Sequence, residues 1–355
     1  MRRWAGLGLT WVMACGGSVP GEMASVQGGV EVRGKGPVST PASTASDVPV
    51  SKTAGASPPF SSLLPEGEVP SWDVLFGELL LPTAFLVPPL EVHEWGTFTS
   101  VQSPDGKDME GLHHEEEPLP SFVHGRGGMC WGFGKCLEIV PVGVTQKMET
   151  PVIYFHGTPK DEAGNAVATV RVDFPKGVIS QWFPEATAWE PPVGALNGAE
   201  TLGGGSMTWT VAFNPDGFAP PVVSESDIWA PSRRVPAATP LRGPNGEDEH
   251  FIFYRGLGRF SLPVRTVSVP GDSDELQVWN DHAADVIPAA FLVRVEEDGA
   301  GIVPLGAIAA GGQVSRSALV PLTDMDRFIA DARGHLTAAL TESGLTLDES
   351  VAMVD

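Results

Sequence analysis

Half of the eight histidines in this sequence lie between residues 93 and 124, among several acidic residues. Imidazole nitrogens and carboxylate oxygens are ligands that zinc, copper, nickel and iron accept from proteins. A clustered set contributed by two neighbouring segments can close one site, so the sequence predicts a divalent metal ion as a candidate cofactor. The candidate metal ligands are His93, Glu94, His113, His114, Glu117 and His124.

The spacing of these residues leaves two interpretations open. The pair His93-Glu94 is not followed by a second histidine four residues later, as a helical zinc-protease motif requires. The run from His113 to Glu117 is equally typical of a solvated turn, and a histidine close to a tryptophan is often a hydrogen-bonded structural residue. His156 and Asp173 are further candidates, since residues at strand ends can reach clefts that loops shape.

The first residues have the layout of a bacterial signal peptide. Two arginines precede an apolar run from Trp4 to Met13, which leads into small residues and a cysteine. The string Val12-Met13-Ala14-Cys15 resembles a lipobox, in which the cysteine becomes the first residue of the mature chain and carries the lipid. We expect residues 1–14 to be this signal peptide and the protein to be anchored to a membrane of the cell envelope through Cys15. An ordinary cleaved signal, and hence a secreted protein, is the alternative.

Two further cysteines, Cys130 and Cys136, flank a short stretch with two glycines. Disulfides persist in exported proteins, so we expect these two cysteines to form one. A metal site here is the weaker alternative, because no second cysteine pair or nearby histidine accompanies them. The sequence contains no Gly-x-Ser-x-Gly nucleophile elbow, and Gly256-Leu257-Gly258 lacks the third glycine of a nucleotide-binding loop.

The net charge of the chain indicates which classes of partner it can bind. Lysine and arginine total 22 and aspartate and glutamate total 44, so the net charge is −22. We expect no nucleic-acid partner, because proteins that bind nucleic acid present a basic stripe to the phosphates. An acidic exterior suits a divalent cation or a cationic partner, and it is also typical of a merely solvated surface.

Composition and periodicity divide the chain into segments. Residues 15–70 are rich in Gly, Ser, Thr, Ala and Pro and predict a disordered tether. In residues 71–258, short β-branched and aromatic runs such as 152–155 and 207–213 alternate with turn residues, which predicts a β-rich domain. Residues 259–322 predict a small, immunoglobulin-like β-sandwich. The expected fold class is therefore mainly β, with a short helical segment at 323–355.

The helical segment is predicted from a change of apolar period to 3.6. Thr323 is the expected cap of its first helix and Gly344 the expected stop, while Thr346 and Glu349 form a capping box for a second helix. That helix spans only two turns before the sequence ends, fewer than the roughly 12 residues at which isolated helices hold. We expect the chain to be truncated there.

Four strings carry a resemblance to a known group of proteins: residues 93–99 (HEWGTFT), 147–155, 172–177 and 253–257. Over residues 90–355 the chain resembles a family of exported proteins from myxobacteria, planctomycetes and similar environmental bacteria. No activity is assigned to that family, so the resemblance implies no catalytic residues. It also implies that the helix starting at Thr346 runs into a tryptophan-containing continuation.

These observations favour an envelope lipoprotein with a binding or structural role, whose ligand is a surface polymer, a protein partner or a cation. The alternative is a metal-dependent extracytoplasmic enzyme, most plausibly a hydrolase, in which the bound ion activates water.

Overall fold

The computed structural model describes residues 90–112, 119–126, 143–158, 165–190, 204–269 and 275–355, together with the backbone of strands at 8–15, 30–33, 129–131 and 135–137. Antiparallel strands are the predominant elements, and two helices follow at the C-terminal end. The prediction of a mainly β fold is confirmed. Among the described helices, none combines the length and the apolar character needed to span a membrane.

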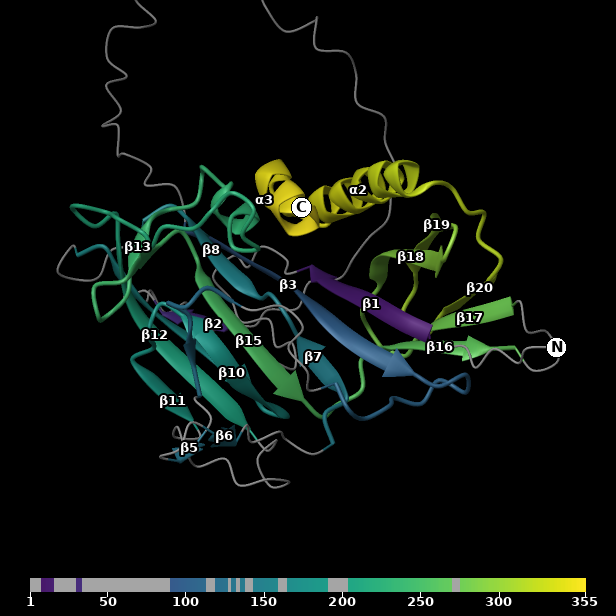
Figure 1. The fold of residues 1–355 in the computed structure, drawn as a ribbon, viewed down its shortest axis with the longest axis horizontal. Helices are drawn as coiled ribbons and strands as arrows, with labels where there is room; N and C mark the ends of the chain where they lie inside the picture. Colours follow the sequence, from purple (N-terminus) through teal and green to yellow (C-terminus); the bar gives the residue numbers. More distant parts are fainter. Residues whose placement is uncertain are drawn as a thin grey trace, which may run out of the picture. The chain divides into compact units, whose positions relative to one another are not determined.

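Two larger sheets form the centre of the fold (Figure 1). The first sheet has seven strands: β1 (Gly8–Cys15), β3 (Glu91–Gln102), β4 (His124–Gly125), β7 (Gln146–Met148), β8 (Val152–His156), β10 (Gly177–Phe183) and β15 (Ile252–Gly258). The second has six: β2 (Val30–Arg33), β9 (Val167–Phe174), β11 (Ala188–Glu190), β12 (Gly205–Phe213), β13 (Leu241–Arg242) and β14 (Asp248–Glu249). Every pairing within these sheets is antiparallel.

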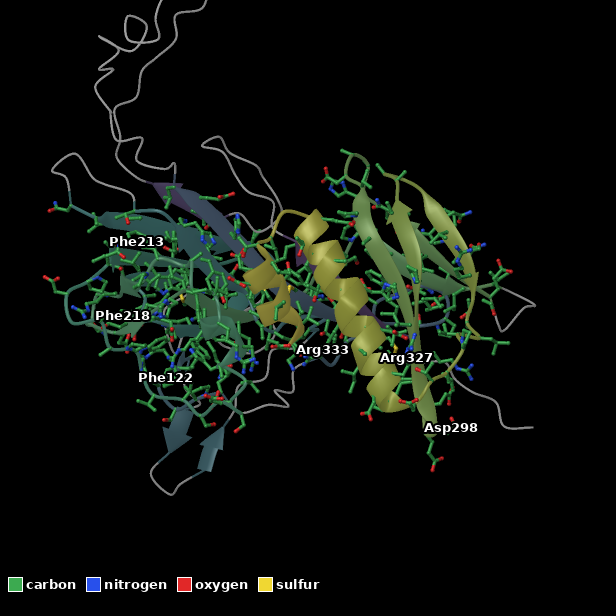
Figure 2. The ribbon with its side chains drawn as sticks, turned by 90° about the horizontal axis from the view of Figure 1, so that it is seen from above. Phe122, Phe213, Phe218, Asp298, Arg327 and Arg333 are labelled. Carbon is green, nitrogen blue, oxygen red and sulfur yellow. The ribbon has the colours of Figure 1, made fainter. Side chains whose placement is uncertain are left out.

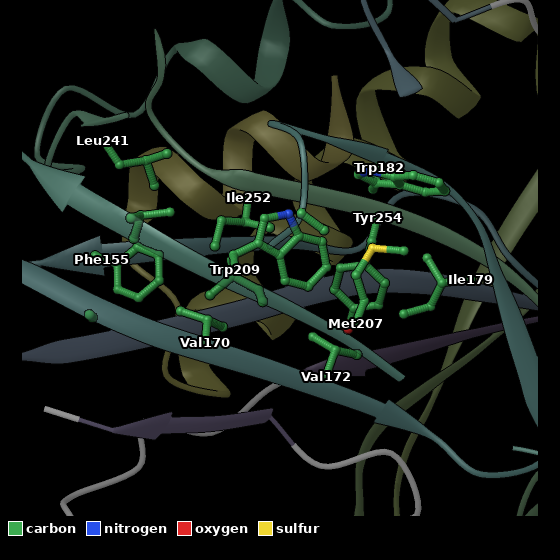
Figure 3. Close-up of a cluster of buried hydrophobic side chains, with 14 of the residues drawn as sticks. Phe155, Val170, Val172, Ile179, Trp182, Met207, Trp209, Leu241, Ile252 and Tyr254 are labelled. Atoms are coloured by element: carbon green, nitrogen blue, oxygen red, sulfur yellow. The ribbon is translucent and has the colours of Figure 1, made fainter. Parts of the chain in front are cut away.

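Side chains of β8 show how the first sheet divides two hydrophobic cores. Successive residues of a strand point to opposite faces. Ile153 and Phe155 therefore pack toward the second sheet, around the fully buried Trp209 (Figure 3). Val152 and Tyr154 face the other way and join a second, aromatic-rich cluster. The result is a sandwich whose first sheet is covered on both faces.

The outer face of the first sheet is covered by the C-terminal helices α2 (Met325–Glu342) and α3 (Leu347–Val354) and by a segment that carries Trp229 and the short 3-10 helix η2 (Pro231–Arg233). Leu340 of α2 and Ala352 of α3 are buried in this second cluster. The C-terminal helices therefore pack on strands that lie about 200 residues earlier in the sequence, such as β3 and β8.

The caps of the two helices were predicted with unequal success. The capping box of Thr346 and Glu349 at the start of α3 is confirmed. The prediction of Thr323 as the cap of α2 is wrong: Asp324 is the cap, and its side chain accepts a hydrogen bond from Arg327 N. Thr323 is unavailable because its backbone pairs with Ala300 in an isolated β-bridge.

Two smaller sheets lie between residues 264 and 317. One contains β16 (Val264–Ser268), β17 (Glu275–Asn280) and β20 (Gln313–Ser317), and the other is the hairpin of β18 (Ile287–Glu296) and β19 (Gly299–Ile308). They enclose a small core of Val264, Val278, Leu305 and Ile308. Figure 2 shows α2 running beside this hairpin, where the rings of Phe291 and His335 lie 5.9 Å apart.

The expected boundary at residue 259 stays a prediction. In the part of the chain that the structure describes, β1, β2 and the residues from 90 onward cluster in one compact unit, with contacts across that boundary. Gln102 is an example, since its side-chain amide donates to Val264 O and accepts from Thr266 N across that boundary. Strand β1 runs through the expected signal peptide, and β2 interrupts the expected tether.

Candidate metal centre

Three side chains from distant parts of the chain meet on the outer face of the first sheet: His93, His156 and Glu349. One potential ligand atom from each of them lies within 4.8 Å of the other two. His93 and Glu349 are buried, and the side chain of His156 is 14% exposed. This is the set of histidine, cysteine and acidic residues in the described part of the chain that comes together in this way.

The β3–β8 pairing explains how the two histidines approach each other. In the antiparallel register His93 lies opposite Tyr154, and His156 lies opposite Glu91. His93 and His156 are therefore diagonal neighbours on the same face, a distance that large side chains can span. Their ring centroids are 4.9 Å apart, with 57° between the ring planes.

Glu349 reaches the histidines from the first turn of α3. Its Oε2 accepts hydrogen bonds from Thr346 N and Thr346 Oγ1, both at 2.8 Å, and Glu349 N donates to Thr346 Oγ1 at 3.2 Å, which completes the capping box. The same oxygen lies 2.7 Å from His93 Nδ1, and Oε1 lies 3.1 Å from His156 Nε2. The local signal that starts the helix thus also aims the carboxylate at the sheet.

The electrostatics favour an ionised carboxylate at Glu349. Burial alone would raise the pKa of Glu349, but hydrogen bonds to His156 and His93 and to the backbone of Thr346 outweigh it and hold that pKa well below its usual range. The pKa of His93 is raised, mainly by its hydrogen bond to Glu349, although burial opposes this shift. The site therefore attracts positive charge into a largely buried position.

The nitrogen of each imidazole that faces away from Glu349 has an acceptor nearby. His156 Nδ1 lies 3.2 Å from Ala237 O. His93 Nε2 lies 3.2 Å from Glu91 Oε1, an ion-pair contact whose angles do not make a well-formed hydrogen bond. Metal-bound histidines commonly have such a carbonyl or carboxylate behind them.

Counting protons at His156 shows what a cation would replace. A carbonyl and a carboxylate can only accept, so both ring nitrogens must carry a proton if both hydrogen bonds form. A metal ion at Nε2 would take the place of one proton and leave the bond to Ala237 intact. The donor set, two imidazoles and one carboxylate, is one that first-row transition metals accept.

Of the three expected metal ligands that the structure describes, His93, Glu94 and His124, only His93 belongs to this centre. Glu94 lies on the opposite face of β3, where its carboxylate accepts a hydrogen bond from the hydroxyl of Tyr254 between the two sheets. Burial raises the pKa of Glu94 to about 7, against the smaller opposing effect of that hydrogen bond. Grouping Glu94 with His93 was wrong because neighbours on a strand face opposite ways.

His124 lies in a separate cluster. Its Nε2 is 2.8 Å from Glu247 Oε1, and its Nδ1 is 3.3 Å from Glu185 Oε2. Both carboxylates are also held from behind, since Glu185 accepts from Trp182 Nε1 and Glu247 accepts from Glu185 N. The imidazole fills the space between two acids, and the prediction that it shares a site with His93 was wrong.

Of the remaining candidate site residues, the structure describes only Asp173. Asp173 pairs with Arg171 two residues away on the same strand, as an exposed ion pair. His113, His114 and Glu117 lie outside the described residues.

For the expected disulfide between Cys130 and Cys136, the structure describes only how the backbone pairs. Cys130 and Cys136 are directly opposite in the hairpin of β5 (Met129–Trp131) and β6 (Lys135–Leu137), but their side chains lie outside the described residues. The disulfide stays a prediction, as does the lipidation of Cys15 at the end of β1.

Glu349 is the candidate ligand that sequence reasoning missed. Its capping-box spacing identified it as a helix-start residue. A capping carboxylate can still accept from other partners: Oε2 accepts from Thr346 and faces His93, while Oε1 faces His156. Its partners His156 and His93 are 193 and 256 residues away along the chain, and no local sequence pattern links them to Glu349.

Comparison of the chain with protein-family models, curated proteins and solved structures finds no match. The resemblance to exported myxobacterial and planctomycete proteins is therefore a proposal, and the function must be argued from the site.

Proposed function

We propose that this protein is an exported, lipid-anchored envelope protein that binds one divalent transition-metal ion through His93, His156 and Glu349. The observation that carries the proposal is the convergence of their three potential ligand atoms within 4.8 Å. Of the ligand classes expected for an envelope-binding role, the site favours a cation over a surface polymer or a protein partner.

The arrangement around the ligands supports a metal ion over a purely structural hydrogen-bond network. A network that only packs α3 needs one proton between each histidine and Glu349. Here Ala237 O lies behind His156, Glu91 Oε1 lies 3.2 Å from the far nitrogen of His93, and Oε2 of Glu349 accepts from Thr346 as well as facing His93. These are the outer partners that orient ligands at metal sites.

Three protein ligands leave room for a fourth ligand at a tetrahedral zinc ion. Structural zinc sites commonly have four protein ligands, whereas catalytic sites keep one position for water. This count favours a second candidate function, a metal-dependent hydrolase whose bound water is the nucleophile. The low exposure of the site restricts such an enzyme to substrates that can reach the edge formed by His156 and Glu91.

Elemental analysis of protein purified without an affinity tag tests the metal proposal directly. We expect close to one equivalent of zinc or a related ion per chain, and calorimetric titration of chelator-treated protein should restore it. The variants His156→Ala and Glu349→Gln should lose this binding, whereas His335→Ala, which removes an exposed histidine of α2, should retain it. The proposal is wrong if the wild-type protein neither contains nor takes up a transition metal at micromolar concentration.

Assays on ester, phosphoester and peptide substrates distinguish the two candidate functions. Turnover that disappears on chelation and returns with zinc would favour the hydrolase. Metal binding without turnover of any of these substrate classes would favour the non-catalytic binding protein.

A further inference from the structure

The metal centre joins the last helix of the chain to two strands of the first sheet. We infer that metal occupancy controls the docking of α3: the ion acts as a clamp that holds this helix on the outer face of the first sheet. The inference rests on the proposed function and adds to it what binding does to the protein.

Apolar packing holds only part of α3: Ala352 is buried, and Met353 and Val354 are partly buried against the second cluster. The helix contains eight residues, a length at which an isolated helix is unstable in water. Two of its apolar residues, Leu347 and Val351, are 61% and 39% exposed, so they contribute little to docking. Its buried residues are Glu349, Ser350 and Ala352, of which only Ala352 is apolar.

Apart from Glu349, α3 makes one partly buried side-chain hydrogen bond to the body, from Thr341 Oγ1 to Ser350 Oγ, and two ion pairs at its end. Asp355 pairs with Arg234 and Arg333 at 2.9 Å, but both arginines are more than half exposed. Exposed ion pairs contribute little because water and salt screen them. Glu349 is different, since its side chain is fully buried against His93 and His156.

A buried carboxylate makes docking conditional on positive charge. Removing Glu349 from water is costly unless a cation or a set of donors compensates it. A divalent ion held by both histidines supplies that charge at the point where α3 meets the sheet. Without it, docking relies on protons at the same two imidazoles.

Coordination is compatible with a folded α3. Oε1 of Glu349 faces His156, whereas Oε2 faces His93 and also accepts from Thr346, so the carboxylate would bind an ion between the two histidines without leaving the helix cap. The capping box that starts the helix is therefore also the outer partner of the metal ligand. Glu349 completes both the capping box of α3 and the metal site, so we expect the helix and the site to form together.

Linkage sets the size of the expected effect. The three ligands come together only when α3 is docked, so the ion binds the docked state in preference to the undocked one. At a free metal concentration about 100 times the dissociation constant, the ratio of docked to undocked chains should rise roughly 100-fold.

Hydrogen exchange of the full chain, followed by mass spectrometry with and without zinc, tests this inference. The reporters are the α3 amides that donate one turn back, such as Ser350 N to Thr346 O and Asp355 N to Val351 O. Under the zinc excess above, their exchange should slow by up to about 100-fold. Exchange in β12, which lies in the other sheet, should not change.

Variants separate the clamp from general stabilisation. Glu349→Gln keeps the size of the side chain but removes its charge, and it should abolish the zinc response of α3. Asp348→Asn removes the neighbouring exposed carboxylate and should leave the response intact. If Glu349→Gln fails to fold, a zinc titration of the wild-type protein still tests the inference.

The possible outcomes distinguish the inference from the proposed function. Slowed α3 exchange that follows calorimetric saturation supports both. Zinc binding with unchanged α3 exchange refutes the clamp and leaves the metal site standing. Absence of zinc binding refutes the proposed function, and the clamp with it.

Discussion

Glu94 offers the sharpest test of how the sandwich treats a buried acid. Its carboxylate lies between the two sheets beside the buried Tyr254, and burial raises its pKa from 4.5 to about 7. The folded protein therefore holds this proton more tightly than the unfolded chain does. The stability contributed by the group is complete below about pH 4.5 and is lost as the pH rises through about 7.

The size of the effect follows from the two pKa values. The difference, about 7 minus 4.5, is about 2.5 units, and each unit corresponds to about 1.36 kcal/mol. Above pH 8 the ionised Glu94 should thus lower the free energy of unfolding by on the order of 3 kcal/mol, relative to pH 4.5. Glu94→Gln keeps the shape and neutrality of the protonated acid, so the variant should lack this loss.

Urea denaturation in the presence of a chelator measures the effect without interference from metal binding. The free energy of unfolding of Glu94→Gln, minus that of the wild-type protein, should increase by roughly 3 kcal/mol between pH 4.5 and pH 8.5. Glu342→Gln, which removes an exposed carboxylate of α2, is the matched control and should show no comparable change. A difference between Glu94→Gln and wild type that stays constant with pH would refute the reasoning.

Three further predictions concern other parts of the chain. His124→Ala should lower the free energy of unfolding by about 1–3 kcal/mol, because two partly buried carboxylates lose a shared partner; zinc binding should be unchanged, and its loss in calorimetry would mean that the two histidine clusters are coupled. Trp209→Ala should cost about 3–5 kcal/mol in thermal or urea unfolding, since this fully buried indole fills the core and donates to Pro184 O; a cost below about 1 kcal/mol would show that the core tolerates the cavity. Mass spectrometry of non-reduced protein should find Cys130 joined to Cys136, and two free thiols would contradict either the disulfide or the export prediction.

The strands and helices could be predicted well because their signals are local. Short β-branched and aromatic runs between turn residues predicted the strands around Val152 and Met207, and the spacing of Thr346 and Glu349 predicted the start of α3. The cap of α2 was misplaced by one residue for a non-local reason. Thr323 is an acceptable cap by type, but it pairs with Ala300, which no local pattern reveals.

The candidate site shows the same division more clearly. The sequence by itself determined that His93 is a candidate ligand, that His156 ends a strand and that Glu349 starts a helix. From the sequence we also grouped His93 with His124, because separation along the chain was the only measure of their proximity. In the structure these two histidines lie in separate clusters with different acidic partners.

Only the tertiary structure decided which side chains meet. The register of β3 and β8 places His93 and His156 on one face, and the packing of α3 on that face delivers Glu349. Both are long-range choices, since the carboxylate reaches across 193 residues to one histidine and 256 to the other. They depend on the burial of whole faces against one another, and local sequence spacing carries no information about that pairing.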